Sequence, residues 1–355
     1  MQKEFYWTYL IKPKGKNEAI IVWQWNAWEH LTQNKYSDLA NYSKSIKPEL
    51  IDINYNLELN SSADFLHFNS IDYNPQNNQI LVSVRNYNEI WIIDHSTTAS
   101  QAKNHKGGKS NMGGDLIYRW GNPTAYGLNE KEQLEGQHSA SWIKKGYINE
   151  GSITLFDNRA TTRHSRLLII SPSFNRKTNL YEAKNNVYLP NIETWSYTQA
   201  ALSEGRGGGL QGLPNGNILF CETSKGRLTE ITTNKDTAWM YTIPISSEGA
   251  LIQSYDENKN LGGMFNANKY ASTFIGFKGK NLIPGNTLEL NPNVEFGRIE
   301  INKSLDTLKT YTLYLSLSNC YLNINQTTLL YNHPISVYNS VGELIDRQTI
   351  TTGGR

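Results

Sequence analysis

Cysteine, methionine and excess charge are all scarce in this chain, and each scarcity excludes a class of protein. The 355 residues include two cysteines and four methionines. No cysteine or histidine lies two to five residues from Cys221 or Cys320, so the spacing supports neither a zinc site nor a disulfide framework. Lys and Arg number 34 against 32 Asp and Glu, whereas a nucleic-acid-binding domain usually has a concentrated basic excess. We therefore expect no metal, no other cofactor and no nucleic-acid partner.

Long apolar runs are missing as well. No stretch reaches the roughly eighteen apolar residues of a membrane-spanning helix, so we expect no membrane span. The first residues, Met1–Thr8, lack the apolar stretch of a signal peptide. At face value this indicates a cytoplasmic protein, and the alternative is that the chain is part of a longer one.

Aromatic residues and turn residues are abundant. Trp, Tyr and Phe make up 11% of the chain, and there are 27 glycines, a composition that suits an all-β protein. Short apolar runs are separated by turns, as in Gln79–Val84 and Glu89–Asp94. A similar pair recurs at Ile218–Glu222 and Arg227–Ile231, and a looser copy includes Ser152–Phe156. The sequence therefore predicts repeated groups of short antiparallel strands.

The repeat length points to a particular architecture. Equivalent isoleucines, Ile80, Ile153 and Ile218, lie about 65 to 75 residues apart. This is long for one propeller blade unless the loops carry insertions. Repeating groups of about four strands predict a β-propeller, and the alternative is a β-sandwich with coincidental similarity between its parts. In a propeller, the inner strands converge on a central channel, where several blades can contribute to one site.

The pattern changes near residue 293, where apolar and polar residues largely alternate as in a separate small sheet. The runs are Arg298–Ile301, Thr310–Leu315, Cys320–Ile324 and Ile335–Tyr338. We predict two domains: a propeller over residues 1–292 and a small β-sandwich-like module over residues 293–355.

Three polar residues beside strand-like runs are candidates for a site. His67 and Asn69 begin a run in which strand alternation predicts one shared face with Ile71. Arg85 ends an apolar strand and needs a partner. That partner is either an acidic neighbour, Glu89 or Asp94, or a bound anion.

His138 lies in a loop just before a strand, from which its side chain can project into a channel. The other histidines have no comparable setting, and we expect them to be surface or structural residues: His30, His95, His105, His164 and His333. Cys221 follows an apolar run and is expected to be a buried thiol. Asp157 and Asn158 are expected to shape a turn, and the alternative is that they line the channel. The segment Glu204–Leu210 is either an anion-binding nest with Arg206 or a flexible loop.

Seven segments in order resemble the bacterial arylsulfate sulfotransferase family, over roughly residues 18–285. These segments are His67–Tyr73, Ser83–Arg85, Glu89–Thr97, Tyr118–Pro123, Gly136–His138, Leu155–Asn158 and Leu213–Asn217. Proteins of that family are six-bladed propellers that transfer sulfuryl groups between phenols without a nucleotide sulfate donor.

The resemblance implies a role for each candidate. His138 matches the histidine that attacks sulfur and becomes a transient sulfohistidine. His67, Asn69 and Arg85 match residues that bind the sulfate oxygens and the phenolic oxygen. An imidazole is a competent nucleophile, and a guanidinium neutralises charge on the sulfuryl oxygens. A second phenol then takes the group, so ping-pong kinetics are expected with an aryl sulfate and a phenol as small-molecule partners.

The sequence also departs from the family. A further active-site histidine in an earlier blade has no counterpart here, and a family threonine that would fall near Gly207–Gly209 is not matched. About four blades' worth of sequence is present. The chain therefore resembles the C-terminal part of a longer protein, and an open propeller would expose strand edges that tend to aggregate.

The tail resembles the C-terminal sorting domain of type IX secretion, on Tyr321–Ile324 and Ile335–Ile345. Together the two resemblances imply a periplasmic or extracellular protein that engages secretion machinery. Two other functions stay open: a non-catalytic propeller that binds sulfated or phenolic ligands or a protein partner, and a hydrolase that transfers the sulfuryl group to water.

Overall fold

The protein is all-β. The computed structural model describes residues 7–55, 64–159, 162, 164–246, 249–251, 263–285, 288–289, 299–301, 334–338 and 344–349. Helical structure within these residues consists of five short 3-10 segments: η1 (Ala27–His30), η2 (Arg85–Tyr87), η3 (Gln101–Lys103), η4 (Pro123–Tyr126) and η5 (Ile275–Phe277). No helix in these ranges is long and apolar enough to cross a membrane.

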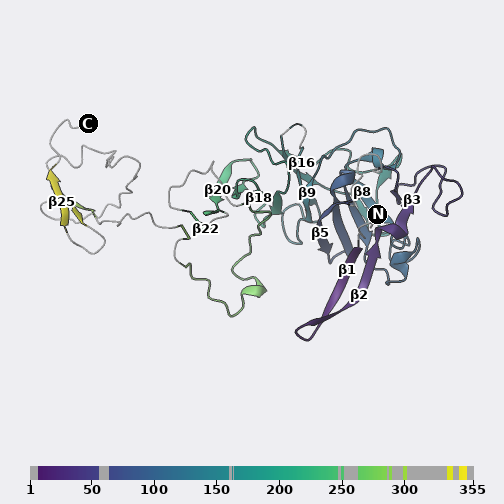
Figure 1. Ribbon diagram of the computed structural model, residues 1–355, viewed down its shortest axis with the longest axis horizontal. Coiled ribbons are helices and arrows are strands. Elements are labelled where there is room, and N and C mark those ends of the chain that lie inside the picture. The colour runs from purple at the N-terminus through teal and green to yellow at the C-terminus, as the bar shows by residue number, and fades with distance from the viewer. Residues whose placement is uncertain are drawn as a thin grey trace. The chain divides into compact units, whose positions relative to one another are not determined.

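Three four-stranded antiparallel sheets form the framework (Figure 1). In each, the strands follow one another in space in the order in which they occur in the chain. The first sheet comprises β5 (Phe68–Asn74), β6 (Gln79–Val84), β7 (Glu89–Asp94) and β8 (Leu116–Trp120). The second comprises β9 (His138–Trp142), β10 (Ile153–Asp157), β11 (Arg166–Ile170) and β16 (Trp195–Tyr197). The third comprises β17 (Gly209–Gly212), β18 (Ile218–Glu222), β19 (Arg227–Ile231) and β20 (Thr237–Thr242).

This arrangement is that of propeller blades, and it confirms the predicted fold class. The three repeated isoleucines, Ile80, Ile153 and Ile218, each fall in the second strand of a sheet. The inner strands β5 and β9 of the first two sheets lie side by side, and so do β9 and β17. The two-stranded hairpin of β1 (Trp7–Lys14) and β2 (Glu18–Asn26) precedes these sheets. The described residues therefore contain three four-stranded sheets, where about four blades' worth of sequence was expected.

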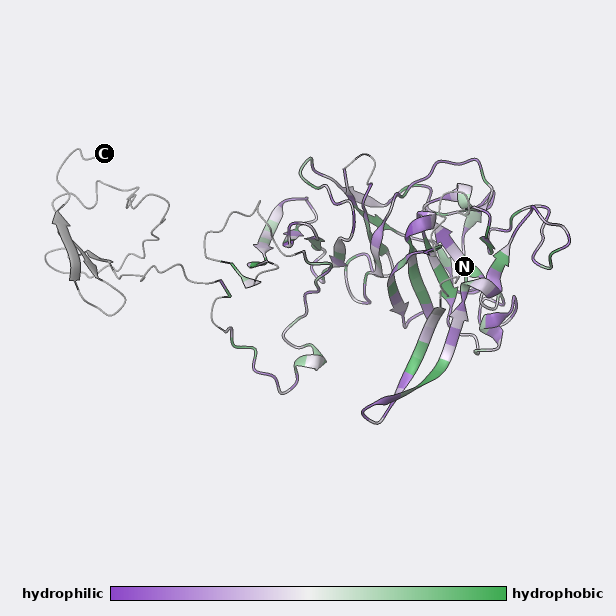
Figure 2. Ribbon diagram, viewed as in Figure 1, coloured by the Kyte–Doolittle hydropathy of each residue, from purple (hydrophilic) through white to green (hydrophobic). Residues whose placement is uncertain are grey.

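Apolar side chains join the sheets face to face, because central strands such as β6 and β7 are buried along their whole length. Figure 2 shows these central strands coloured largely as hydrophobic. Leu81 and Ile92 of the first sheet share a core cluster with Leu155 and Leu168 of the second. A further cluster links the second sheet to the third. Burial on both faces of a strand is the pattern of an internal blade, and it removes most of the apolar surface of these strands from water.

Short accessory strands occur before β5, between β11 and β16, and after β20. β3 (Leu31–Thr32) pairs in parallel with β4 (Ile51–Asp52). Three two-stranded antiparallel pairs are formed by β12 (Phe174–Asn175) with β13 (Leu180–Tyr181), β14 (Ala183–Lys184) with β15 (Val187–Tyr188), and β21 (Ile245–Ser246) with β22 (Gly249–Ala250). The pairs β12–β13 and β14–β15 lie between Ile153 and Ile218 and lengthen that repeat.

The chain divides into two compact units. The first contains residues 1–251 and 255–287, and the second contains residues 252–254 and 288–355. The second unit has one three-stranded antiparallel sheet of β23 (Ile299–Ile301), β24 (Pro334–Tyr338) and β25 (Leu344–Thr349). The strands expected over residues 310–315 and 320–324 lie outside the described residues. The boundary between residues 292 and 293 and the sandwich-like character of the module remain predictions.

Candidate functional site

His138 occupies the first position of β9 and is buried, with 4% of its surface exposed. It pairs with Phe156 of β10, and the register then shifts before Thr154 pairs with Ser141. Ser139 has a φ of +56° at this shift. A bulge of this kind kinks the strand and changes where its side chains point. Sequence patterns do not reveal it, because alternation is interrupted for only one residue.

The orientation of the His138 ring is fixed by Asn158, just beyond the end of β10. Nδ1 of His138 lies 2.8 Å from Oδ1 of Asn158 and 3.0 Å from the carbonyl oxygen of Gly136. The Asn158 Nδ2 group donates to two further carbonyl oxygens, those of Glu204 and Gly207, each at 2.9 Å. The amide can satisfy both carbonyls only with its oxygen toward the histidine. Nδ1 therefore carries the proton, and Nε2 keeps its lone pair.

The environment keeps this imidazole neutral. Burial lowers the pKa of His138 below its ordinary value, and the nearby charges of Arg85 and His67 lower it further. The hydrogen bonds to Asn158 and Gly136 act in the opposite direction, because they favour the protonated ring. Since burial dominates, His138 stays uncharged to a lower pH than an exposed histidine.

Asn69 lies against the backbone next to His138. Its Nδ2 donates to the carbonyl oxygen of Gln137 at 2.7 Å. The Oδ1 atom of Asn69 and the Oε1 atom of Gln137 are both buried without a hydrogen-bond partner in the described part of the chain. Buried acceptors of this kind are rare and call for an explanation.

The predicted alternation through Asn69 is wrong. Phe68 pairs with Val84, but Ser70 pairs with Ser83, so one extra residue stands between two consecutive partners. A bulge at Asn69 interrupts the alternation of side chains between the two faces of the strand. Asn69 and Ile71 therefore do not share a face as expected, and Ile71 is 61% exposed. Bulges thus occur in both blades, at Asn69 and beside His138.

Neither acidic neighbour suggested for Arg85 is its partner. Glu89 binds Arg119 through both carboxylate oxygens, and Asp94 accepts hydrogen bonds from Ser96 and Ser110. The Arg85 guanidinium donates to Oδ1 of Asn86 at 3.1 Å. Among the residues that the structure describes, no carboxylate forms an ion pair with it, so the guanidinium charge is available for an anion.

His67 immediately precedes β5 and is linked to both Arg85 and Asp64. Its carbonyl oxygen accepts a hydrogen bond from the backbone N–H of Arg85 at 3.1 Å. Its Nδ1 contacts a carboxylate oxygen of Asp64. His67 has a φ of +54°, in the left-handed region that is uncommon for residues other than glycine. Backbone strain of this kind often marks a functional position. The side chain of His67 is about 40% exposed.

The structure therefore brings the four predicted site residues together at one end of two neighbouring blades. Asn158 was missed as a site residue, because its contact with His138 joins residues 20 apart in the chain. A threonine also lies near the segment where none could be matched: Oγ1 of Thr223 accepts from the N–H of Gly208 at 2.7 Å. The ring of Phe265 packs edge-on against His138, with centroids 6.0 Å apart.

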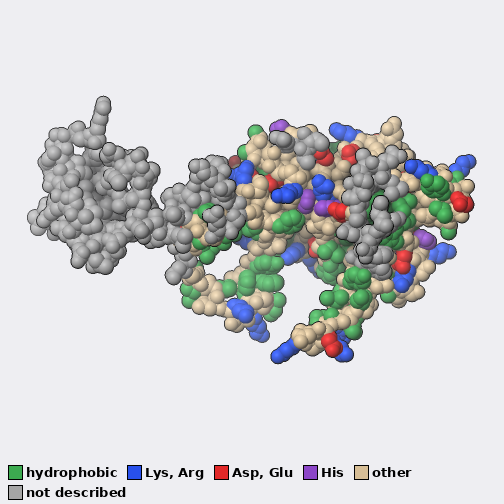
Figure 3. Space-filling model, in the orientation of Figure 1, with side chains coloured by type: hydrophobic (Ala, Val, Ile, Leu, Met, Phe, Trp, Pro, Cys, Tyr) green, Lys and Arg blue, Asp and Glu red, His purple; other side chains and the backbone are tan. Residues whose placement is uncertain are grey.

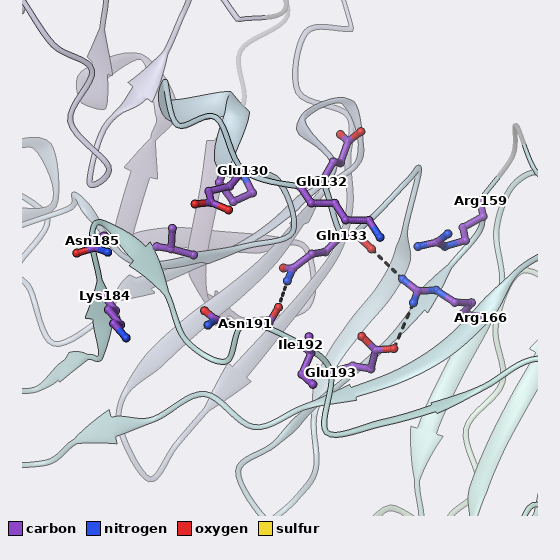
Figure 4. A pocket seen from close by; sticks show the side chains of 13 residues that line it. Glu130, Glu132, Gln133, Arg159, Arg166, Lys184, Asn185, Asn191, Ile192 and Glu193 are labelled. Carbon is purple, nitrogen blue, oxygen red and sulfur yellow. Dashed lines mark hydrogen bonds and ion pairs between the residues drawn. The ribbon is translucent and has the colours of Figure 1, made fainter.

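A cavity of about 460 Å³ lies elsewhere and includes none of the four predicted residues (Figure 4). Arg166 and Arg159 line it, and both bind the buried carboxylate of Asp157. Arg166 also reaches Glu193 and the carbonyl oxygen of Gln133. Both arginines are therefore already paired and are less available to an anion than the guanidinium of Arg85.

Fold and site together define an all-β propeller-type protein with a buried, neutral imidazole next to a guanidinium that has no carboxylate partner in the described residues. The arylsulfotransferase family model matches residues 11–243. The chain belongs to this sulfotransferase family.

Known structures with similar folds are distant. A catalytically inactive virginiamycin B lyase from Staphylococcus aureus, solved with quinupristin, is 12% identical, with 51% of this chain and 42% of that chain covered and a TM-score of 0.28. The β-propeller domain of Cps50 (Swd1) from Myceliophteria thermophila is 11% identical over 64% and 52%, with a TM-score of 0.33. The chain thus spans about half or less of these relatives. No curated protein matches it.

Proposed function

We propose that this protein transfers a sulfuryl group from an aryl sulfate to a phenol through a sulfohistidine at His138. The observation that carries the proposal is the fixed ring of His138. Asn158 holds the proton on Nδ1, so the lone pair of Nε2 is available as a nucleophile. The lowered pKa keeps that lone pair unprotonated at neutral pH.

The first half-reaction forms one bond and breaks another. Nε2 of His138 attacks the sulfur atom, the bond between sulfur and the aryl oxygen breaks, and the phenolate leaves with the electron pair. Arg85 neutralises negative charge on the sulfuryl oxygens during this step. The second half-reaction is the reverse with a different phenol, whose oxygen attacks sulfur while the electrons of the N–S bond return to Nε2.

His67 and Asn69 would handle the phenolic oxygen. A departing phenolate needs a proton, and an attacking phenol must lose one. His67 is oriented by Asp64 through Nδ1, which leaves Nε2 to exchange a proton with the phenol. Asn69, which donates to the carbonyl oxygen of Gln137 next to His138, would help to position the phenol.

The direct test is turnover of a chromogenic aryl sulfate with and without a phenol acceptor. We expect transfer by the wild-type chain and none by His138→Ala. His164→Ala is the matched control, because His164 is exposed and, within the described residues, its ring hydrogen-bonds to the carbonyl oxygen of Thr162. Equal turnover by His138→Ala would refute the mechanism. Free sulfate released at a rate that phenol does not raise would identify a hydrolase instead.

The proposal includes the cellular location and the partners of the protein. We place it in the periplasm or outside the cell, with an aryl sulfate and a phenol as its small-molecule partners and no nucleic acid. The C-terminal module would engage secretion machinery. This placement is supported by the family membership and by the likeness of the tail to a sorting domain.

A further inference from the structure

Two histidines and an aspartate from three separate segments meet away from the His138 site. His30 ends η1, His105 lies in the loop after η3, and Asp115 directly precedes β8. One ligand atom from each lies within 4.8 Å of the others. Nδ1 of His30 is 2.8 Å and Nδ1 of His105 is 2.7 Å from the same oxygen, Oδ1 of Asp115.

The ring of His30 is fixed by stacking and by contacts at both of its nitrogens. Its side chain is fully buried, and its ring stacks on Trp25 with an interplanar angle of 1°. Its Nε2 lies 2.9 Å from the carbonyl oxygen of Ala102. Gly114 makes this approach possible, since a Cβ there would lie 2.1 Å from that oxygen and 2.6 Å from Nε2. These contacts orient the His30 ring so that its Nδ1 faces Asp115.

We propose that His30, His105 and Asp115 bind a divalent first-row transition ion of the Zn²⁺ type. Imidazole nitrogens with one carboxylate oxygen form a common donor set for such ions. A metal-ligating histidine almost always donates its other ring N–H to a carbonyl or carboxylate. The contact between Nε2 of His30 and Ala102 supplies that bond and selects the tautomer whose Nδ1 is free to bind metal.

The geometry around Asp115 is that of a shared centre. Both ring nitrogens of His30 face oxygen atoms, with Nδ1 beside Asp115 and Nε2 beside Ala102. The His105 ring approaches the same oxygen of Asp115 from another segment. A metal ion bound between them would account for the convergence of two imidazoles on one carboxylate.

The site is accessible from one side. The side chain of His105 is 60% exposed and lines a cleft of about 310 Å³ that also includes Glu29 and Thr32. An ion can enter there, and water can complete its coordination. The expected role is structural, because the ion would join η1, the loop after η3 and the start of β8. The proposal does not depend on sulfuryl transfer.

The test is a titration of the tag-free, EDTA-treated chain with ZnCl2, followed by calorimetry. We expect one equivalent to bind the wild type. His105→Ala and Asp115→Asn should each weaken Zn²⁺ binding by about 100-fold or more. Changing only a residue that orients a metal ligand already weakens binding by about 10- to 100-fold. His105 is exposed, so His105→Ala should fold normally, and His164→Ala is the matched control that keeps wild-type affinity.

Two further measurements make the assignment decisive. Co²⁺ in place of Zn²⁺ should give visible ligand-field bands that His105→Ala lacks, and bound Zn²⁺ should raise the melting temperature of the wild type more than that of His105→Ala. Equal Zn²⁺ affinity of wild type and His105→Ala would overturn the proposal. So would a preference for Ca²⁺ or Mg²⁺, which indicates an oxygen-donor site elsewhere.

Discussion

Asn158 acts on the proposed reaction through the ring of His138 and not through the substrate. Its Nδ2 is committed to two carbonyl oxygens and its Oδ1 to Nδ1 of His138. A histidine free to rotate or to change tautomer would present the nucleophilic lone pair only part of the time. Asn158 is therefore a positioning residue, and its effect should be visible in a pH profile.

Asn158→Ala should lower kcat/KM by roughly 10- to 100-fold, comparable to the loss of an orienting partner at a metal-ligating histidine. The nucleophile is the neutral ring, so activity falls as pH drops through the pKa of His138. That pKa is below about 6.5 in the wild type. Because the bond to Asn158 raises the pKa, its loss should move the acid limb to still lower pH.

Initial rates across a pH series measure this effect, with Asn34→Ala, an exposed asparagine, as the control. Lower activity with an unmoved acid limb would mean that Asn158 supports only the fold. If the acid limb of the pH profile moves to higher pH, the hydrogen bond to Asn158 does not raise the pKa of His138, and the prediction is wrong.

At the scale of strands and blades, the sequence predicted the repeated strands but only part of the candidate site. The spacing of Ile80, Ile153 and Ile218 predicted three equivalent strands, because a short apolar run bounded by turn residues is a local signal for a strand. Cys221 is buried as expected. The bulge at Asn69 and the contact of Asn158 with His138 were not predictable, since a register shift and a long-range side-chain contact leave no period in the sequence.

The first blade also contains a buried ion pair that ties its strands together. Arg119 of β8 and Glu89 of β7 are fully buried and joined by two hydrogen bonds. Arg119 also donates to the carbonyl oxygen of Leu50. Burial raises the pKa of Glu89, and Arg119 opposes that rise. A pair in this position is costly to break from one side, because the remaining charge stays buried.

Arg119→Met alone should therefore destabilise the protein by about 3–5 kcal/mol. Combining it with Glu89→Gln should cost less than the sum of the two single changes, since the double variant leaves no buried charge. Urea unfolding of the four proteins gives this coupling. Glu18→Gln, in the exposed pair with Lys14, is the control and should change stability little. Strictly additive losses would mean that the pair has no energetic coupling.

At the scale of the whole molecule, apolar surface is left exposed on the β1–β2 hairpin, which projects from the first unit (Figure 1). Successive residues on both strands are exposed, including Ile11 at 56%, Ile20 at 50% and Ile21 at 57%. Figure 3 shows hydrophobic side chains gathered there. The base is anchored differently, because Trp23 and Trp25 are buried in the core cluster of the first sheet.

The exposed part of this hairpin should make the chain associate with itself. In the described residues, β1 and β2 pair only with each other, so their outer edges are open to another strand. Ile11 and Ile21 are register partners, and replacing them with Lys and Glu keeps a favourable cross-strand pair while removing apolar surface. Since each buried isoleucine contributes about 1.5–3 kcal/mol, the double variant should associate at least tenfold more weakly.

Sedimentation at several protein concentrations measures this association. The wild type should form larger species as concentration rises, and Ile11→Lys with Ile21→Glu should remain smaller over the same range. Ile192→Lys is the matched control, because Ile192 is exposed in a loop outside the hairpin. If the double variant associates as strongly as the wild type, the hairpin is not the contact surface, and the exposed strand β20, with Trp239 and Met240, becomes the next segment to change.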